Sequence, residues 1–78
     1  MKKVTIYSTP SCTYCHKAKE FFKEKGIKFE DHDVSADAAR RTEMIDLSGQ
    51  MGVPVITVDN DLVIGFNKPV LSQLLGIQ

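Results

Sequence analysis

Polar and apolar residues alternate over residues 2–8, and the same period returns more weakly over 27–34, as in strands that bury one face. Residues 53–58 are apolar or β-branched almost throughout and give the clearest strand pattern of the chain. A polar turn at 59–61 separates them from a returning strand at 62–64, which predicts a hairpin. The pattern therefore predicts four strands, of which the last two pair as a hairpin.

Three other stretches carry apolar residues three or four positions apart, which is the spacing of one helix face. The first covers residues 13–25, and Gly26 stands where a C-terminal glycine cap belongs. The second covers residues 36–47 with Ser35 as its N-cap, and the third follows an N-cap at Asn67. The buried stripe expected of the second helix, continuing past its end, consists of Met44, Leu47 and Met51.

The predicted order of elements is β-α-β-α-β-β-α. A strand–helix–strand unit followed by a hairpin forms one mixed sheet with helices on both of its faces. The prediction is an α/β fold with a four-stranded sheet, in which the first strand is central and the hairpin supplies the far edge. At this length we expect residues 1–78 to form a single domain.

Charge balance excludes one class of partner and suggests a polarised surface. Ten Lys and Arg balance ten Asp and Glu, whereas a general nucleic-acid binder carries a basic excess. Residues 1–28 hold seven Lys and two Glu, and residues 29–61 hold eight acidic residues and two Arg. This split is typical either of solvated helix faces or of a pattern that selects a partner.

No segment resembles a membrane span or an export signal. The apolar run near the start covers only residues 4–7, whereas a signal core needs about 7–15 apolar residues and a membrane helix about 20. We therefore expect a cytoplasmic protein without membrane association.

Two cysteines, Cys12 and Cys15, stand where the first predicted strand gives way to the first predicted helix. In a reducing compartment a close cysteine pair is a poor candidate for a structural disulfide. The loop that such a disulfide closes is also too short to add much stability. The first N–H groups of a helix lack internal partners and favour negative charge, so Cys12 is expected to be an exposed thiolate nucleophile. Cys15 is expected one turn on and beneath it, where it can resolve a mixed disulfide by closing a Cys12–Cys15 disulfide.

Two other uses of the cysteine pair stay open. A structural zinc site would need His16 and His32 as its remaining ligands, and a second paired motif is missing. Residues 12–16 also match the Cys-x-x-Cys-His pattern of covalent haem attachment, although the strands and the missing export signal argue against it. Redox chemistry is the interpretation that the loop position of Cys12 favours.

Pro54 is the second informative residue, because it falls inside the strongest strand pattern. It either opens the strand as a trans proline or follows a cis peptide bond after Val53. A cis bond beside the cysteines would leave the backbone N–H and C=O of Val53 free to pair with an extended peptide.

The element order, Cys12-Thr13-Tyr14-Cys15, Val53-Pro54 and Gly65-Phe66-Asn67 together resemble the glutaredoxins, which have the thioredoxin fold. The resemblance covers essentially the whole chain. It implies a monomeric thiol–disulfide oxidoreductase without a bound cofactor, with a redox-active Cys12–Cys15 disulfide, a cis Val53–Pro54 bond and glutathione as co-substrate. Its substrates would be disulfide-containing proteins or glutathione mixed disulfides. The residues implied in binding them are Thr9, Thr13, Tyr14, Val53, Pro54, Gly65, Phe66 and Asn67.

Three of the glutathione contacts usual in the family are replaced in this chain. Thr9 stands where relatives often have Lys, Gly52 where Thr is common, and Asn67 where an Asp holds the γ-glutamyl group. Residues 65–69 instead resemble the small redoxins that donate electrons to ribonucleotide reductase and are reduced by thioredoxin reductase. Those redoxins usually carry a Trp, and this chain has none. A thioredoxin-reductase-type flavoprotein is therefore the alternative electron donor.

Thr13 replaces the Pro that relatives commonly have between the cysteines. Its N–H, and its hydroxyl, are expected near the Cys12 sulfur, which would favour the thiolate and make the protein a better oxidant. Phe66 is interpreted either as part of the substrate groove or as a core residue at the hairpin end. Some relatives with one active-site cysteine hold a metal or iron–sulfur cluster between subunits, but Cys15 makes this a remote alternative here.

Overall fold

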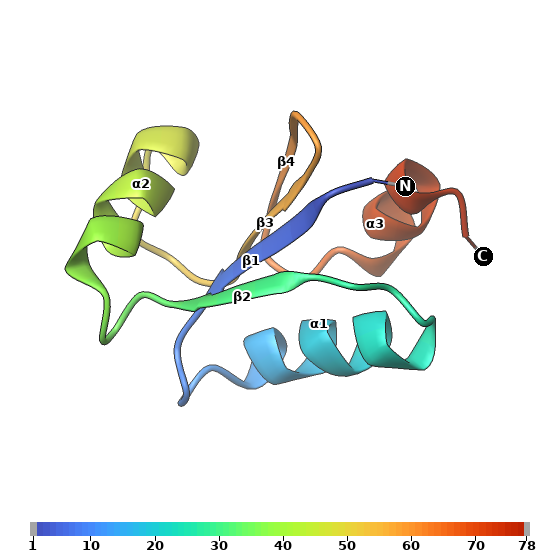
Figure 1. Cartoon of the computed structure of the whole chain (residues 1–78), viewed down its shortest axis with the longest axis horizontal. Helices are drawn as coiled ribbons and strands as arrows, with labels where there is room; N and C mark the ends of the chain where they lie inside the picture. Colours follow the sequence, from blue (N-terminus) through green and yellow to red (C-terminus); the bar gives the residue numbers. More distant parts are fainter. Residues whose placement is uncertain (1, 78) are drawn as a thin grey trace.

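A computed structural model, which describes residues 2–77, forms a single sheet with helices packed on it (Figure 1). The elements are β1 (Val4–Ser8), α1 (Thr13–Glu24), β2 (Glu30–Asp33), α2 (Ala38–Ser48), β3 (Val55–Val58), β4 (Asp61–Ile64) and α3 (Lys68–Leu75). The order across the sheet is β2-β1-β3-β4. The predicted element order, the central first strand and the hairpin at the edge are confirmed.

The strand register brings three chain segments together at one end of the sheet. β1 runs parallel to β2 and antiparallel to β3, and β3 runs antiparallel to β4. Tyr7, near the end of β1, lies opposite Val55 at the start of β3, and Val55 lies opposite Ile64 at the end of β4. The segments that follow β1 and β4 and the segment that precedes β3 therefore meet at this end.

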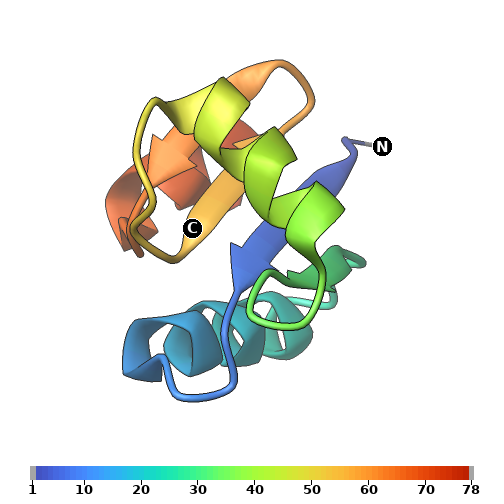
Figure 2. The same cartoon turned by 90° about the vertical axis from the view of Figure 1, so that its left-hand side faces the viewer.

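Alternation along the strands divides the core between the two faces of the sheet. α1 and α3 cover one face, and α2 covers the other (Figure 2). The cluster on the α1 and α3 side contains Val4, Ile6, Ala18, Phe21, Phe22, Ile56, Val58, Val63 and Leu71. The smaller cluster on the α2 side contains Tyr7, Val34, Met44 and Val55. The expected helices on both faces are confirmed.

The start of α2 differs from the sequence prediction. Asp37, not Ser35, is the N-cap, and its side chain accepts a hydrogen bond from the Arg40 N–H at 3.1 Å. Ser35 instead donates its hydroxyl to Asp33, and its backbone N–H donates to the same carboxylate at 2.9 Å. The turn after β2 therefore uses Ser35, and the helix begins two residues later than predicted.

The predicted buried stripe of α2 is wrong beyond Met44. Met44 is buried, but Leu47 is 49% exposed and Met51 is 68% exposed. The helix ends at Gly49, whose φ of 72° lies in the left-handed region, so Met51 does not continue the helix face. Local periodicity does not show what lies opposite a helix face, and here the sheet covers only part of it.

Three boundaries also move by a few residues. β2 is shorter than predicted, and β3 begins after Pro54, whose ring nitrogen has no hydrogen to donate to a strand. Asp61 belongs to β4, and the turn narrows to Asp59, with φ 54°, and Asn60. The predicted caps Gly26 and Asn67 lie where expected. Among residues 2–77, no helix is long and apolar enough to span a membrane.

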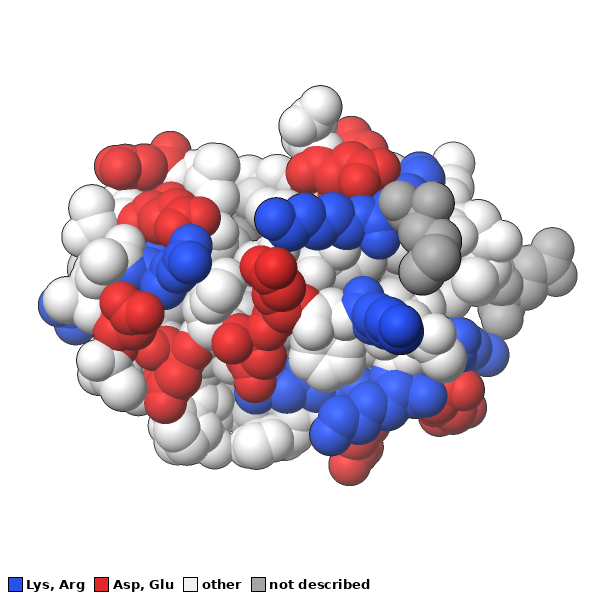
Figure 3. Space-filling view, viewed as in Figure 1, with Lys and Arg blue, Asp and Glu red and all other residues white. Residues whose placement is uncertain are grey.

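The charged side chains separate only in part along the molecule, because Lys and Arg side chains also lie on the left of Figure 3 and acidic ones at its centre and right. In Figure 3 acidic side chains gather on the left, over α2, whereas lysines lie over the centre and right of this face. The separation is incomplete because ion pairs cross it: Lys3 lies 4.0 Å from Glu30, and Lys19 lies 2.7 Å from Asp31.

Candidate active site

Cys12 is both the end of the β1–α1 loop and the N-cap of α1. Its φ and ψ of −86° and 111° are extended, so the chain turns into the helix directly after it. The Cys12 Sγ accepts a hydrogen bond from the Cys15 N–H at 3.2 Å, and the Cys12 N–H donates to the Thr9 carbonyl at 3.2 Å. The sulfur therefore occupies the position where a helix N-terminus stabilises negative charge.

Cys15 lies one turn into α1 on the face that packs against the sheet. Its side chain is fully buried, whereas Cys12 is partly exposed, and both are free thiols. Burial raises the pKa of the Cys15 thiol to about 12, and the hydrogen bond to Cys12 acts in the same direction. The Thr9 backbone and the charge of Lys19 oppose this increase in pKa. Cys15 is therefore a thiol at neutral pH, below a partly exposed Cys12.

The Val53–Pro54 peptide bond is cis, as the family resemblance implies. Within residues 2–77, no protein backbone group bonds to the N–H or C=O of Val53, whereas the Pro54 carbonyl accepts from the Gly65 N–H at 2.8 Å. Since β3 begins beside the end of β1, these residues lie at the same end of the sheet as Cys12. The structure thus brings the predicted loop segments together.

The remaining predicted site residues differ in what they contact. Tyr14 is 61% exposed beside the cysteines, with the Lys17 Nζ 5.3 Å from the centre of its ring. Phe66 is half-buried, and its ring centre lies 5.8 Å from that of Phe21, so it packs against the core. The Asn67 side chain accepts from the Val70 N–H at 3.4 Å as the N-cap of α3. Its oxygen is thus already used within the protein.

Thr13 is the first residue of α1 and is exposed. Within residues 2–77, the hydrogen bond to the Cys12 sulfur comes from Cys15, and no bond from Thr13 reaches it. A donor role for Thr13 toward this sulfur therefore stays a prediction. Cys15 is the donor because the N–H three residues beyond an N-cap points at the cap side chain, whereas that of the next residue does not.

Neither histidine lies in a metal site in the described part of the chain. The His16 Nε2 lies 2.7 Å from the Pro10 carbonyl oxygen. The His32 ring lies 5.5 Å from the Tyr7 ring, and its Nε2 lies 3.6 Å from Glu30. Across residues 2–77, no three His, Cys, Asp or Glu side chains converge as metal ligands. The two histidines have separate, local contacts.

A charged network next to Cys15 was not predicted from the sequence. The Asp31 carboxylate accepts from the Ser8 hydroxyl at 2.8 Å and pairs with the Lys19 Nζ at 2.7 Å. Ser8 is 1% exposed. A sequence signal exists for one member only: Lys19 stands four positions after Cys15, on the same side of the helix.

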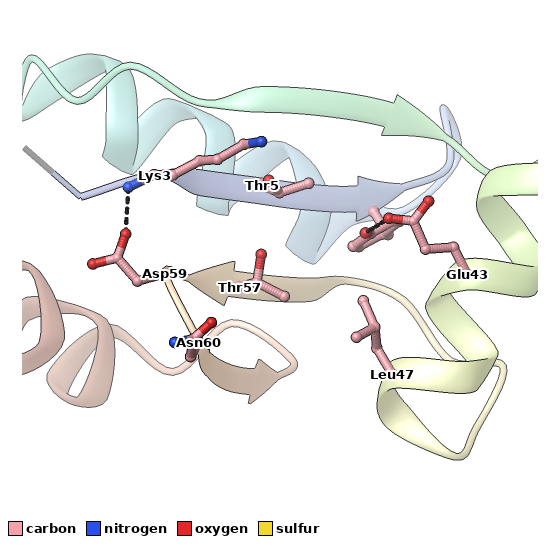
Figure 4. Close-up of a pocket in the computed structure, with 8 residues that line it drawn as sticks. Lys3, Thr5, Glu43, Leu47, Thr57, Asp59 and Asn60 are labelled. Carbon is pink, nitrogen blue, oxygen red and sulfur yellow. Dashed lines mark hydrogen bonds between the residues drawn. The ribbon is translucent and has the colours of Figure 1, made fainter.

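A groove lies away from the cysteines, on the α2 face of the sheet (Figure 4). Its volume is about 640 Å³. The residues that line it are Lys3, Thr5, Tyr7, Glu43, Leu47, Thr57, Asp59 and Asn60. Tyr7 donates to Glu43 at 2.7 Å across one end of the groove. It contains neither cysteine, so the redox site is a surface feature at the sheet end, not this groove.

The fold and the exposed–buried cysteine pair define a thiol redox protein with the thioredoxin fold. Residues 4–63 match the family described as glutaredoxin. The chain is 47% identical over 72 residues to an uncharacterised glutaredoxin-like 8.6 kDa protein of the rubredoxin operon of Clostridium pasteurianum, covering 92% of this chain and 96% of that one. The chain belongs to the glutaredoxin family.

Two solved structures extend the comparison to the whole fold. A mutant of the thioredoxin-like protein BC3987 superposes with a TM-score of 0.92 at 36% identity, covering 100% of both chains. The glutaredoxin-like NrdH-redoxin from Escherichia coli superposes with a TM-score of 0.81 at 25% identity, covering 92% of this chain and 93% of that one. The predicted thioredoxin fold is confirmed.

Proposed function

We propose that this protein is a dithiol oxidoreductase that reduces protein or glutathione mixed disulfides. The observation that carries the proposal is the 3.2 Å hydrogen bond from the Cys15 N–H to the Cys12 Sγ, at the N-terminus of α1. A thiolate at this position accepts a charge-assisted hydrogen bond. Because Cys12 is partly exposed, its sulfur can reach and attack a substrate disulfide. Cys12 is therefore the nucleophile.

The reaction proceeds by two exchanges. The Cys12 thiolate attacks one sulfur of the substrate disulfide, forms a mixed disulfide and displaces the other half as a thiolate. Cys15 then loses its proton and attacks the Cys12 sulfur, which releases the remaining half and leaves a Cys12–Cys15 disulfide. The buried position of Cys15 supports this order, because a buried thiol with a raised pKa does not compete for the first attack. Two electrons from a reductant regenerate the dithiol.

Substrate binding in this proposal uses the residues at the same end of the sheet. The free backbone of Val53 would pair with an extended peptide or with glutathione, beside Pro54 and Gly65. Tyr14 offers an exposed aromatic surface next to Cys12, and Thr9 and Thr13 flank the sulfur in the loop and the first turn. The proposed protein acts as a monomer in the cytoplasm, where a reducing environment keeps both thiols available.

Glutathione is the proposed electron donor, and a thioredoxin-reductase-type flavoprotein is the second candidate. One observation favours the second: the Asn67 oxygen caps α3, so it is engaged where relatives have a carboxylate for the γ-glutamyl group. The similar NrdH-redoxin is described as having a thioredoxin-like activity profile. That redoxin class donates electrons to ribonucleotide reductase, which would then be the protein substrate.

A paired assay separates the two donors. The same disulfide substrate is given to the protein with NADPH and either glutathione plus glutathione reductase or thioredoxin reductase alone. We expect NADPH consumption in the glutathione arm, and its loss in Cys12→Ser. NADPH consumption in the thioredoxin reductase arm only would identify that flavoprotein as the electron donor and place the protein in the redoxin class. Absence of turnover in both arms would contradict the proposed function.

A further inference from the structure

A polar network joins α1 to the sheet one helical turn beyond Cys15. Lys19 follows Cys15 by four positions, so the two side chains are neighbours on one side of α1. Asp31 lies opposite Ile6 in the β1–β2 register, and Ile6 belongs to the core on the α1 side. The Lys19 Nζ lies 2.7 Å from Asp31 Oδ2, and the Ser8 hydroxyl donates to Asp31 Oδ1 at 2.8 Å.

The ammonium of this network is unusually sheltered for a lysine. The Lys19 side chain is 19% exposed, whereas the Lys3 side chain of the Lys3–Glu30 pair is 73% exposed. Lysines are rarely buried unless they are paired, and a charge screened by less water acts more strongly on its neighbours. Asp31, at 40% exposure, is the anion paired with Lys19 and offsets part of its charge.

We propose that Lys19 is a positioning residue for the resolving step: its ammonium stabilises the Cys15 thiolate that attacks the mixed disulfide, against the opposing charge of Asp31. The inference rests on the proposed dithiol mechanism. In this step the Cys15 thiol releases its proton to solvent, and its sulfur bonds to the Cys12 sulfur. The Cys12–substrate S–S bond breaks, the electron pair leaves with the substrate sulfur, and that thiolate takes up a proton.

The groups around Cys15 support this role. Burial dominates the raised pKa of Cys15, and the charge of Lys19 is one of the influences that lower this pKa. Cys12 is the other titratable group acting on Cys15 from its own helix. The Thr9 backbone lowers the pKa of Cys15 through a hydrogen bond, and the carboxylate of Asp31 lies on the sheet, paired with Lys19. Once Cys12 is bonded in a mixed disulfide it carries no negative charge, and the charge of Lys19 still acts on the attacking Cys15.

The test follows both exchanges in one reaction with 5,5′-dithiobis(2-nitrobenzoate). Attack by Cys12 releases a first equivalent of coloured thiolate, and resolution by Cys15 releases a second, so stopped-flow absorbance reports two phases. We expect Lys19→Met to slow the second phase and leave the first within about twofold of the parent. If the Cys15 pKa rises by about one unit, the fraction of Cys15 present as thiolate at neutral pH falls about tenfold. Each remaining thiolate is about threefold more nucleophilic, because nucleophilicity increases with pKa, so the second phase slows by about threefold overall.

Three further variants separate a charge effect from a structural one. Lys19→Arg keeps the positive charge, so its second phase is expected to be as fast as that of the parent. Asp31→Asn keeps an acceptor for Ser8 but removes the opposing charge, so it is expected to accelerate the second phase. Lys23→Met removes a lysine from the exposed side of the same helix and is the matched control, with both phases unchanged.

The outcomes are distinct. A second phase in Lys19→Met as fast as in the parent would overturn the proposal, as would an Asp31→Asn variant that slows this phase, which would indicate structural support only. If Lys19→Met does not fold, as judged by circular dichroism, the Asp31→Asn variant still shows whether removing the opposing charge speeds or slows the second phase. A parent protein that shows no second phase would contradict the dithiol mechanism itself rather than the role of Lys19.

Discussion

At the scale of single residues, position alone gives two identical thiols different chemistry. Cys12 caps the helix and is partly exposed, while Cys15, one turn further, is fully buried. Burial penalises a thiolate, and it raises the pKa of Cys15 to about 12. Burial acts in the same direction on Tyr7, on the other face of the sheet, whose pKa is raised to about 12 by burial and by its hydrogen bond to Glu43.

These two raised pKa values predict a loss of stability in alkali. The folded protein keeps the protons of Cys15 and Tyr7, whereas the unfolded chain releases them near the ordinary pKa values of 9.0 and 10.0. Below about pH 9 these two groups should leave the free energy of unfolding unchanged. Above it, the free energy of unfolding should fall as the pH rises toward 12. Urea unfolding of the reduced protein, measured between pH 8 and 11, checks this.

Tyr7→Phe provides the comparison for the alkaline prediction. The variant is expected to be less stable at pH 8, because the Glu43 carboxylate loses its hydrogen bond. Its decline above pH 10 should nevertheless be shallower than that of the parent, since one titrating group is gone. Equal slopes above pH 10 would mean that Tyr7 does not hold its proton in the folded state.

At the scale of elements, the three helices begin with the same bond. In each, the N-cap side chain accepts from the N–H three residues on, with sulfur at Cys12, a carboxylate at Asp37 and an amide oxygen at Asn67. The first helix differs because its cap, Cys12, is the proposed nucleophile. The local rule that starts a helix would therefore also position the nucleophile at the sheet end.

The cap of α2 gives a prediction at this scale. Asp37→Ala removes the acceptor of the Arg40 N–H and should lower the free energy of unfolding by about 1 kcal/mol. For a domain of this size, the melting temperature should then fall by roughly 4–8 °C. Ser35→Ala is the control, and it should change stability by no more than about 0.5 kcal/mol. A larger effect at Ser35 than at Asp37 would restore Ser35 as the cap.

At the scale of the whole molecule, the features that could be predicted are those encoded by neighbouring residues. Helix and strand order, the caps at Gly26 and Asn67, and the cysteine pair at a helix start all follow from local patterns. Exposure of Leu47 and Met51 does not, because burial depends on what packs opposite a helix face.

The network beside Cys15 shows the same limit within the site. Ser8, Lys19 and Asp31 are distant in the chain, and they meet only through the register of β1 and β2 and the packing of α1 on the sheet. Strand β2, at the edge of the sheet, is polar, and its apolar pattern is too weak for its first and last residues to be predicted. The donor on the Cys12 sulfur likewise depends on helix geometry rather than on which residue stands next to it.

The central claim, that Cys12 attacks and Cys15 resolves, is tested most directly by intact-protein mass spectrometry with bis(2-hydroxyethyl) disulfide. Cys15→Ser is expected to accumulate a single mercaptoethanol adduct on Cys12, while Cys12→Ser stays unmodified. The parent should end as an internal disulfide, lighter by two hydrogens and without an adduct. A stable adduct on the parent, or an adduct on Cys15 formed as fast as that on Cys12, would contradict the account.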